Sequence, residues 1–164
     1  MNQRQRKKLS RHLFEATPLG DAARVKALLR AGADPERRDS EGTTPLYVAS
    51  VNGEAEIARL LLASGTSPDS ESRLGWEGTP LCAAACWGYT ETVRQLFTHG
   101  VDRNLHEDHS TGRSPLGWAI DGPHPETAAL LITAGATLTG NHGPSPFVIR
   151  DPISSMDLVL GPLE

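Results

Sequence analysis

One three-residue motif recurs along this chain at a constant spacing, and this regularity limits the folds open to the chain. Three copies of a Thr or Ser followed by Pro and Leu begin at Thr44, Thr79 and Ser114, and these copies start 35 residues apart. A fixed period of about 20–50 residues is typical of repeat proteins, in which one small unit is stacked several times. The sequence therefore predicts a solenoid of repeated units.

A second marker has nearly the same period and extends the pattern toward the N-terminus. Glycine closes an apolar stretch at Gly32, Gly65, Gly100 and Gly135. Glycine adopts positive φ without strain, so it is common directly after the end of a helix. The large apolar pairs that precede these glycines are Leu28-Leu29, Leu61-Leu62, Leu96-Phe97 and Leu131-Ile132. The same unit is therefore written four times.

The residue types within each unit predict a helix, a turn, a second helix and a loop. Thr or Ser accepts hydrogen bonds from free amides at a helix start, and Pro suits the first helical turn because its missing N–H would have no partner there. Ala49, Ala84 and Ala119 each follow the motif leucine by three positions, which gives the first helix a narrow face for close packing. Gly53 and Gly88 suit a tight turn into the second helix.

Two long segments, GTTPLYVASVNGEAEIARLLLASG and GTPLCAAACWGYTETVRQLFTHGVDRN, resemble ankyrin repeats. The resemblance implies an all-α fold, a solenoid of about four stacked helix-turn-helix repeats with β-turn finger loops. Terminal repeats must cover the apolar face of their inner neighbours, so we expect caps at both ends. The expected single domain (1–164) divides into an N-terminal cap at about 6–38, repeats at 39–73, 74–108 and 109–139, and an irregular, degenerate C-terminal cap at 140–164.

The chain departs from the family pattern in two places. The usual His of the helix-opening motif is replaced by Tyr47, Cys82 and Gly117, so we do not expect the usual imidazole hydrogen bonds between repeats, and we expect lower local stability. Residues 66–78 are longer than the family's loop, which predicts an enlarged finger around Trp76.

The resemblance implies a protein-binding surface, because partners of this family are usually held by the finger tips and the exposed side of the first helices. Trp87 and Trp76 stand out, since Trp is enriched at binding hot spots, although both could instead pack against the long finger. The candidate partner-binding residues are Ser40, Glu41, Thr43, Val51, Asn52, Trp76, Cys86, Trp87, Ser110, Thr111, Arg113 and Asp121.

The expected function is a protein-protein interaction module, a scaffold or adaptor that binds one macromolecular partner. The alternative is a regulatory subunit, inhibitor or chaperone of an enzyme, which would use the same surface. The sequence contains no glycine-rich phosphate loop, HExxH or GxSxG motif, so we expect neither enzymatic activity nor a cofactor.

Two clusters of reactive side chains suggest other chemistry. The His-rich segment 99–109, with His99, His106 and His109, could ligate a metal, but its spacing matches no closed structural zinc site. Cys82 and Cys86 are four residues apart, which suits two reduced thiols on one helical turn. We expect the Cys82 thiol to be buried and inert. For Cys86 we expect exposure to solvent without a redox role.

The charge distribution is uneven. The chain has a net charge of −4, yet its first 12 residues carry five basic side chains and no acidic one. We expect this basic segment, Arg4 to Arg11, to be the solvated face of a capping helix; contact with an acidic partner or nucleic acid is the alternative. The acidic remainder argues against broad binding of nucleic acid. With no apolar run long enough for a membrane span, we expect a cytoplasmic protein. We also expect it to be a monomer.

Overall fold

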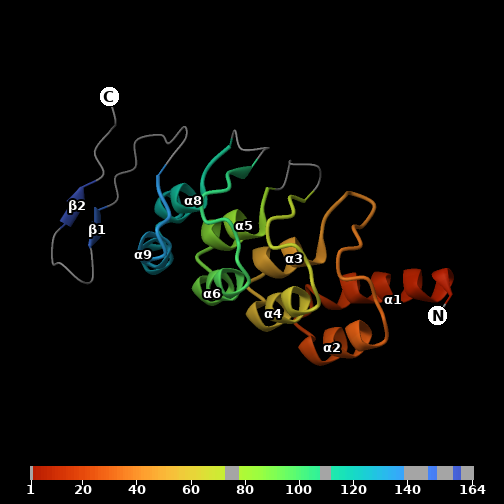
Figure 1. Cartoon of the computed structure of the whole chain (residues 1–164). Coiled ribbons are helices and arrows are strands. Elements are labelled where there is room, and N and C mark those ends of the chain that lie inside the picture. Colours follow the sequence, from red (N-terminus) through yellow and green to blue (C-terminus); the bar gives the residue numbers. More distant parts are fainter. Residues whose placement is uncertain (1, 73–77, 108–111, 139–147, 151–156, 160–164) are drawn as a thin grey trace.

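The computed structural model describes residues 2–72, 78–107, 112–138, 148–150 and 157–159 (Figure 1). Within these ranges, most residues lie in helices that follow one another in antiparallel pairs. The pairs are α1 (Gln3–Ala16) with α2 (Ala22–Arg30), α3 (Pro45–Val51) with α4 (Ala55–Ala63), α5 (Pro80–Cys86) with α6 (Thr90–Thr98), and α8 (Pro115–Asp121) with α9 (Pro125–Thr133).

The helix pairs stack side by side into two layers. In one layer α3 contacts α5 and α5 contacts α8, while in the other α2, α4, α6 and α9 contact each other in that order. Figure 1 shows the connecting loops projecting from the same side of this stack. We call the loops that lead into α3, α5 and α8 the first (31–44), second (64–79) and third (99–114) finger loops. The predicted helical solenoid is confirmed.

The helix starts follow from the recurring motif. The side-chain oxygens of Thr44, Thr79 and Ser114 each accept a hydrogen bond from the backbone amide three residues further on, and Pro follows in the first turn. These caps pair amides that have no partner within the helix. The motif therefore fixes where α3, α5 and α8 begin, as the sequence predicts.

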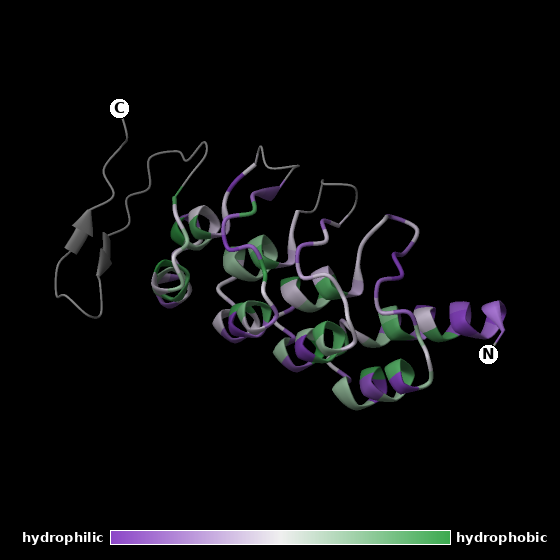
Figure 2. Cartoon of the chain, viewed as in Figure 1, coloured by the Kyte–Doolittle hydropathy of each residue, from purple (hydrophilic) through white to green (hydrophobic). Residues whose placement is uncertain are grey.

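The core runs through the stack as a row of buried apolar side chains. Leu46 and Leu81 are fully buried in the first layer, and Leu61, Leu96 and Leu131 are fully buried in the second. Burying a leucine stabilises a fold by about 1.5–3 kcal/mol. The hydropathy colouring in Figure 2 places the apolar residues on the helices and many of the hydrophilic ones on the finger loops and the first turns of α1.

Hydrogen bonds between finger loops connect neighbouring repeats. In each, a side-chain oxygen at the start of one loop accepts the backbone amide of the next loop, at 2.8–2.9 Å. The acceptor and amide pairs are Glu36 with Ser67, Asp69 with Asp102, and Asn104 with Thr137. This ladder joins the loops along the length of the stack.

The N-terminal helix caps the stack as expected. Leu13 and Ala16 of α1 are fully buried and face α2 and the core, while the first turns of α1 project past the end of the stack (Figure 1). Asn2 and Gln5 close the helix start with reciprocal side-chain hydrogen bonds. No helix in the described ranges combines the length and apolar character needed to cross a bilayer.

In the C-terminal segment, for which the sequence predicts an irregular cap, the structure describes two short strands. Strands β1 (Val148–Arg150) and β2 (Asp157–Val159) pair antiparallel, with Ile149 opposite Leu158, and β1 lies against α9. Branched apolar residues such as Val and Ile favour strands, and the helix-opening motif does not recur in this segment. The described residues of this segment thus add a two-stranded antiparallel sheet beside the last helix of the solenoid.

Candidate partner-binding face

The C-terminal ends of the first helices form a regular row along the solenoid. The helices α3 and α5 are each followed by a turn whose glycine has positive φ, +72° at both Gly53 and Gly88. The residues directly before these glycines, Asn52 and Trp87, are the C-caps of α3 and α5. Because α3 and α5 pack side by side, the sequence period places equivalent residues next to one another along this row. We call these residues the turn row.

The first helix pair has an equivalent position. Gly20, with φ of +68°, forms the turn between α1 and α2, so Leu19 corresponds to Asn52 and Trp87. Leu19 is 73% exposed and Trp87 is 58% exposed, and these are the two most exposed large apolar side chains in the described part of the chain. Both therefore belong to the turn row.

The structure leaves Trp87 open to a partner. More than half of the Trp87 surface is in solvent, so the described residues of the second finger loop do not bury it; the part of that loop around Trp76 lies outside the described residues. Asn52 is also exposed, and its Nδ2 donates to the carbonyl of Val48 at 2.8 Å. Val51 and Cys86, which precede the row on α3 and α5, are half-buried. The burial of Cys86 raises the pKa of its thiol.

In the first finger loop, two of the predicted contact residues are exposed and a third is buried. Ser40 and Glu41 are exposed at its tip. Asp39 shapes this tip, because its carboxylate accepts the backbone amides of Glu41 and Thr43 at 2.9 Å each. Thr43 is only 7% exposed, so, contrary to the prediction, its side chain leaves little surface for a partner.

Two other predicted residues interact with each other. Arg113 at the end of the third finger loop forms an ion pair with Asp121 at the end of α8. The Arg113 guanidinium also lies 5.2 Å from the centroid of the Trp118 ring, within the range of a cation–π contact. The ion pair and the cation–π contact both join the third finger loop to α8. The ion pair also holds the side chains of the two predicted residues, Arg113 and Asp121, against each other.

The remaining calls fall partly outside the described residues. Trp76, Ser110 and Thr111 lie outside them, as do Asp108 and His109 of the His-rich segment. Within the described part of that segment, Nδ1 of His99 is hydrogen-bonded to the Gln95 carbonyl and Nδ1 of His106 to the Gly112 carbonyl. No three metal-ligating side chains of the described residues come together, so the metal alternative gains no support there.

Sequence reasoning missed Leu19. The signal was present, because Gly20 and Asp21 align with Gly53 and Glu54 in the next unit. The same alignment gives Leu19 the position of Asn52. The alignment was overlooked because the helix-opening motif, which marks the start of the later units, does not open α1.

Comparison with known proteins agrees with this architecture. The family model for ankyrin repeats (3 copies) matches residues 6–72 and 64–141. The chain is 34% identical over 125 residues to neurogenic locus notch homolog protein 2 of Homo sapiens, covering 76% of this chain and 5% of that protein. It is 30% identical over 112 residues to the inactive serine/threonine-protein kinase TEX14 of Mus musculus, covering 68% of this chain and 7% of that protein.

A potassium channel contains a similar segment. Potassium channel KOR1 of Oryza sativa subsp. japonica is 29% identical over 175 residues, covering 87% of this chain and 20% of the channel. The chain thus spans a fifth or less of the length of these three relatives. What the relatives share with it is the repeat segment, and the repeated helix pairs, finger loops and family match together show that the chain belongs to the ankyrin repeat family.

Proposed function

We propose that this chain binds one protein partner through the turn row and the tips of the finger loops. The observation that carries the proposal is the exposure of Leu19 and Trp87 at equivalent positions of the solenoid. Ankyrin repeats are generally non-catalytic modules for protein-protein interaction. The proposal adds the face and the residues that this chain uses for binding. We take the repeats to lie at about 39–73, 74–108 and 109–139, preceded by the N-terminal cap at 6–38.

The physical case rests on two properties of this face. A Trp side chain buries a large area on binding and has few rotatable bonds to immobilise, which is why Trp is enriched at hot spots. The backbone on either side of Trp87 is also held in place, by the end of α5 and by the turn at Gly88. A partner therefore meets a side chain on a rigid support, which lowers the entropic cost of association.

Substitution of Trp87 tests the proposal. We expect Trp87→Ala to weaken binding of the partner by about 2 kcal/mol or more, close to thirtyfold in Kd, because a hot-spot aromatic is lost. The free energy of unfolding should change by less than about 0.5 kcal/mol, since most of the side chain is in solvent. The measurement is quantitative co-purification from extracts of the native cell, with thermal unfolding alongside.

Ile132→Ala is the matched control. Ile132 lies on α9 in the other helix layer and is 40% exposed, so its truncation also removes an exposed apolar side chain. We expect it to leave co-purification unchanged. Equal losses with both variants, or a larger loss with Ile132→Ala, would show that the partner does not bind the turn row.

A further inference from the structure

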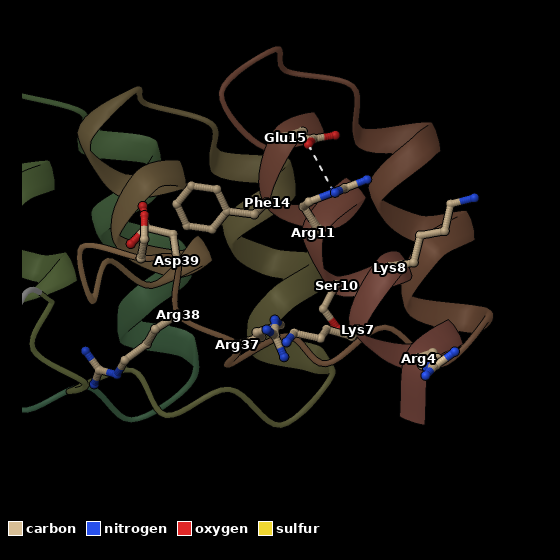
Figure 3. Close-up of a pocket in the computed structure, with 11 residues that line it drawn as sticks. Arg4, Lys7, Lys8, Ser10, Arg11, Phe14, Glu15, Arg37, Arg38 and Asp39 are labelled. Atoms are coloured by element: carbon tan, nitrogen blue, oxygen red, sulfur yellow. Dashed lines mark ion pairs between the residues drawn. The ribbon is translucent and has the colours of Figure 1, made fainter. Parts of the chain in front are cut away.

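A basic groove lies at the N-terminal end of the solenoid, between α1 and the first finger loop (Figure 3). Its volume is about 820 Å³. The cationic side chains that line it are Arg4, Lys7, Lys8 and Arg11 of α1 and Arg37 and Arg38 of the finger loop. The two groups are about thirty residues apart in sequence, and the fold brings them to the same groove.

The groove has a strong excess of positive charge. Only two carboxylates, of Glu15 and Asp39, line it beside the six cations. Glu15 pairs with Arg11 at 3.5 Å, and Asp39 accepts amides of its own loop. The whole chain, in contrast, carries a net charge of −4. The groove is therefore a local site for negative charge on an otherwise acidic molecule.

Several of the cations have no acidic partner in the described part of the chain. Arg4, Lys7, Lys8 and Arg37 form no ion pair there, whereas Arg6, outside the groove, pairs with Asp34 at 3.3 Å. Like charges that converge on one groove repel one another, and the fold gains nothing in electrostatic energy from holding them together. A negatively charged ligand would relieve that repulsion.

Ser10 links the two walls of the groove. Ser10 of α1 is 1% exposed, donates its hydroxyl to the Arg6 carbonyl and accepts the amide of Asp34, both at 2.8 Å. This pair of bonds fastens α1 to the start of the first finger loop. The half-buried ring of Phe14 also lines the groove, as Figure 3 shows, and offers an apolar surface among the cations.

We propose that this groove binds an acidic segment of the protein partner, with carboxylates of the segment paired to the cations of α1 and the first finger loop and an apolar side chain against Phe14. This inference rests on the proposed function and adds the chemistry of the partner. A peptide suits the groove better than nucleic acid, because the cations occupy one short groove and the chain as a whole carries net negative charge, which disfavours binding of a long polyanion.

A synthetic peptide tests the proposal on the full chain. The probe is a fluorescein-labelled peptide rich in glutamate with one central leucine, and the control peptide has glutamine in place of each glutamate. We expect fluorescence anisotropy to show binding of the acidic peptide that weakens as salt is added, because exposed charges are screened. The glutamine peptide should bind at least about tenfold more weakly.

Charge-reversal variants test whether the peptide binds in the groove. We expect Lys7→Glu combined with Arg37→Glu to weaken peptide binding by about tenfold or more. The matched control is Arg24→Glu with Lys26→Glu, which makes the same change in net charge on α2, outside the groove, and should weaken it clearly less. If the first pair lowers Tm, Arg4→Glu with Lys7→Glu gives a second test, since both side chains are exposed on α1.

Three outcomes would overturn the inference: no binding of the acidic peptide, equal losses with the groove and control pairs, or duplex DNA bound as tightly as the peptide. These outcomes are separate from failure of the proposed function. If Trp87→Ala abolishes capture of the native partner but the acidic peptide does not bind, only the acidic-segment inference is wrong. Peptide binding at the groove with native partner capture unaffected by Trp87→Ala would sink only the turn-row proposal.

Discussion

At the scale of single residues, Cys82 shows how this chain replaces a missing histidine. The thiol lies at the position where the ankyrin motif has imidazole, and Sγ lies 3.8 Å from the Leu105 carbonyl and 3.7 Å from that of Arg113. Both carbonyls belong to the third finger loop. Cys82 thus makes weak hydrogen bonds from α5 to the loop of the next repeat, where the sequence predicts only the loss of a network.

The environment of Cys82 predicts its reactivity. Burial, together with the negative charge of Glu107, raises the pKa of the Cys82 thiol to about 12, so almost no thiolate forms at pH 8. We expect iodoacetamide at pH 8 to alkylate the half-buried Cys86 slowly and Cys82 only after unfolding. Mass spectrometry of digested protein measures both sites, and Cys86→Ser should abolish labelling of the folded chain. Labelling of Cys82 as fast as Cys86 in folded protein would contradict this prediction.

At the scale of elements, the finger-loop ladder contains one unfavourable carboxylate. Asp69 accepts the Asp102 amide at 2.9 Å, yet partial burial raises its pKa, and the Asp102 charge adds to this. A raised pKa means that the folded state favours the protonated acid, so ionised Asp69 lowers stability above that pKa. The equivalent residue in the next repeat, Asn104, accepts its amide without a charge.

We therefore expect Asp69→Asn to stabilise the fold at pH 7, by less than about 1 kcal/mol because the site is partly solvated. The advantage over the wild type should shrink as the pH falls through the pKa of Asp69, since the protonated acid is also uncharged. Urea unfolding at pH 7 and near pH 4 measures both values. A variant less stable than wild type at pH 7 would show that the charge strengthens the ladder.

The sequence predicts these elements where local chemistry decides them. Thr44 and Thr79 open helices because capping needs only the residues beside them. The same letters at Thr17, Pro18 and Leu19 lie in a turn, because Thr17 is the C-cap of α1 and Gly20, with positive φ, follows directly. The basic groove could not be predicted, since it depends on how α1 lies against a loop about thirty residues away. The C-terminal strand pair has no repeat marker to reveal it.

At the scale of the whole molecule, stability is distributed along one dimension. Each repeat contacts only its neighbours, so a central repeat is held on two sides and a terminal one on a single side. The pair α3 and α4 contacts α2 on one side and α5 and α6 on the other. Loss of contacts in a terminal repeat should therefore destabilise the central repeats less than loss of contacts in a central repeat destabilises the terminal ones.

Hydrogen exchange can test this gradient. We expect amides in α4 and α6 to exchange at least about tenfold more slowly than those in the first two turns of α1, which project from the stack. Peptide-level mass spectrometry resolves these segments. Equal protection of the projecting turns and the central helices would show that the chain unfolds as one cooperative unit, without end fraying.

The basic groove lies at the α1 end of the stack, while the turn row extends along the stack from Leu19 to Trp87. The groove therefore makes the two ends of the solenoid unlike in charge, although its repeats are alike in fold. On the two proposals above, a partner that contacts both surfaces places its acidic segment at the α1 end, so the position of the groove would set the orientation of that partner along the stack.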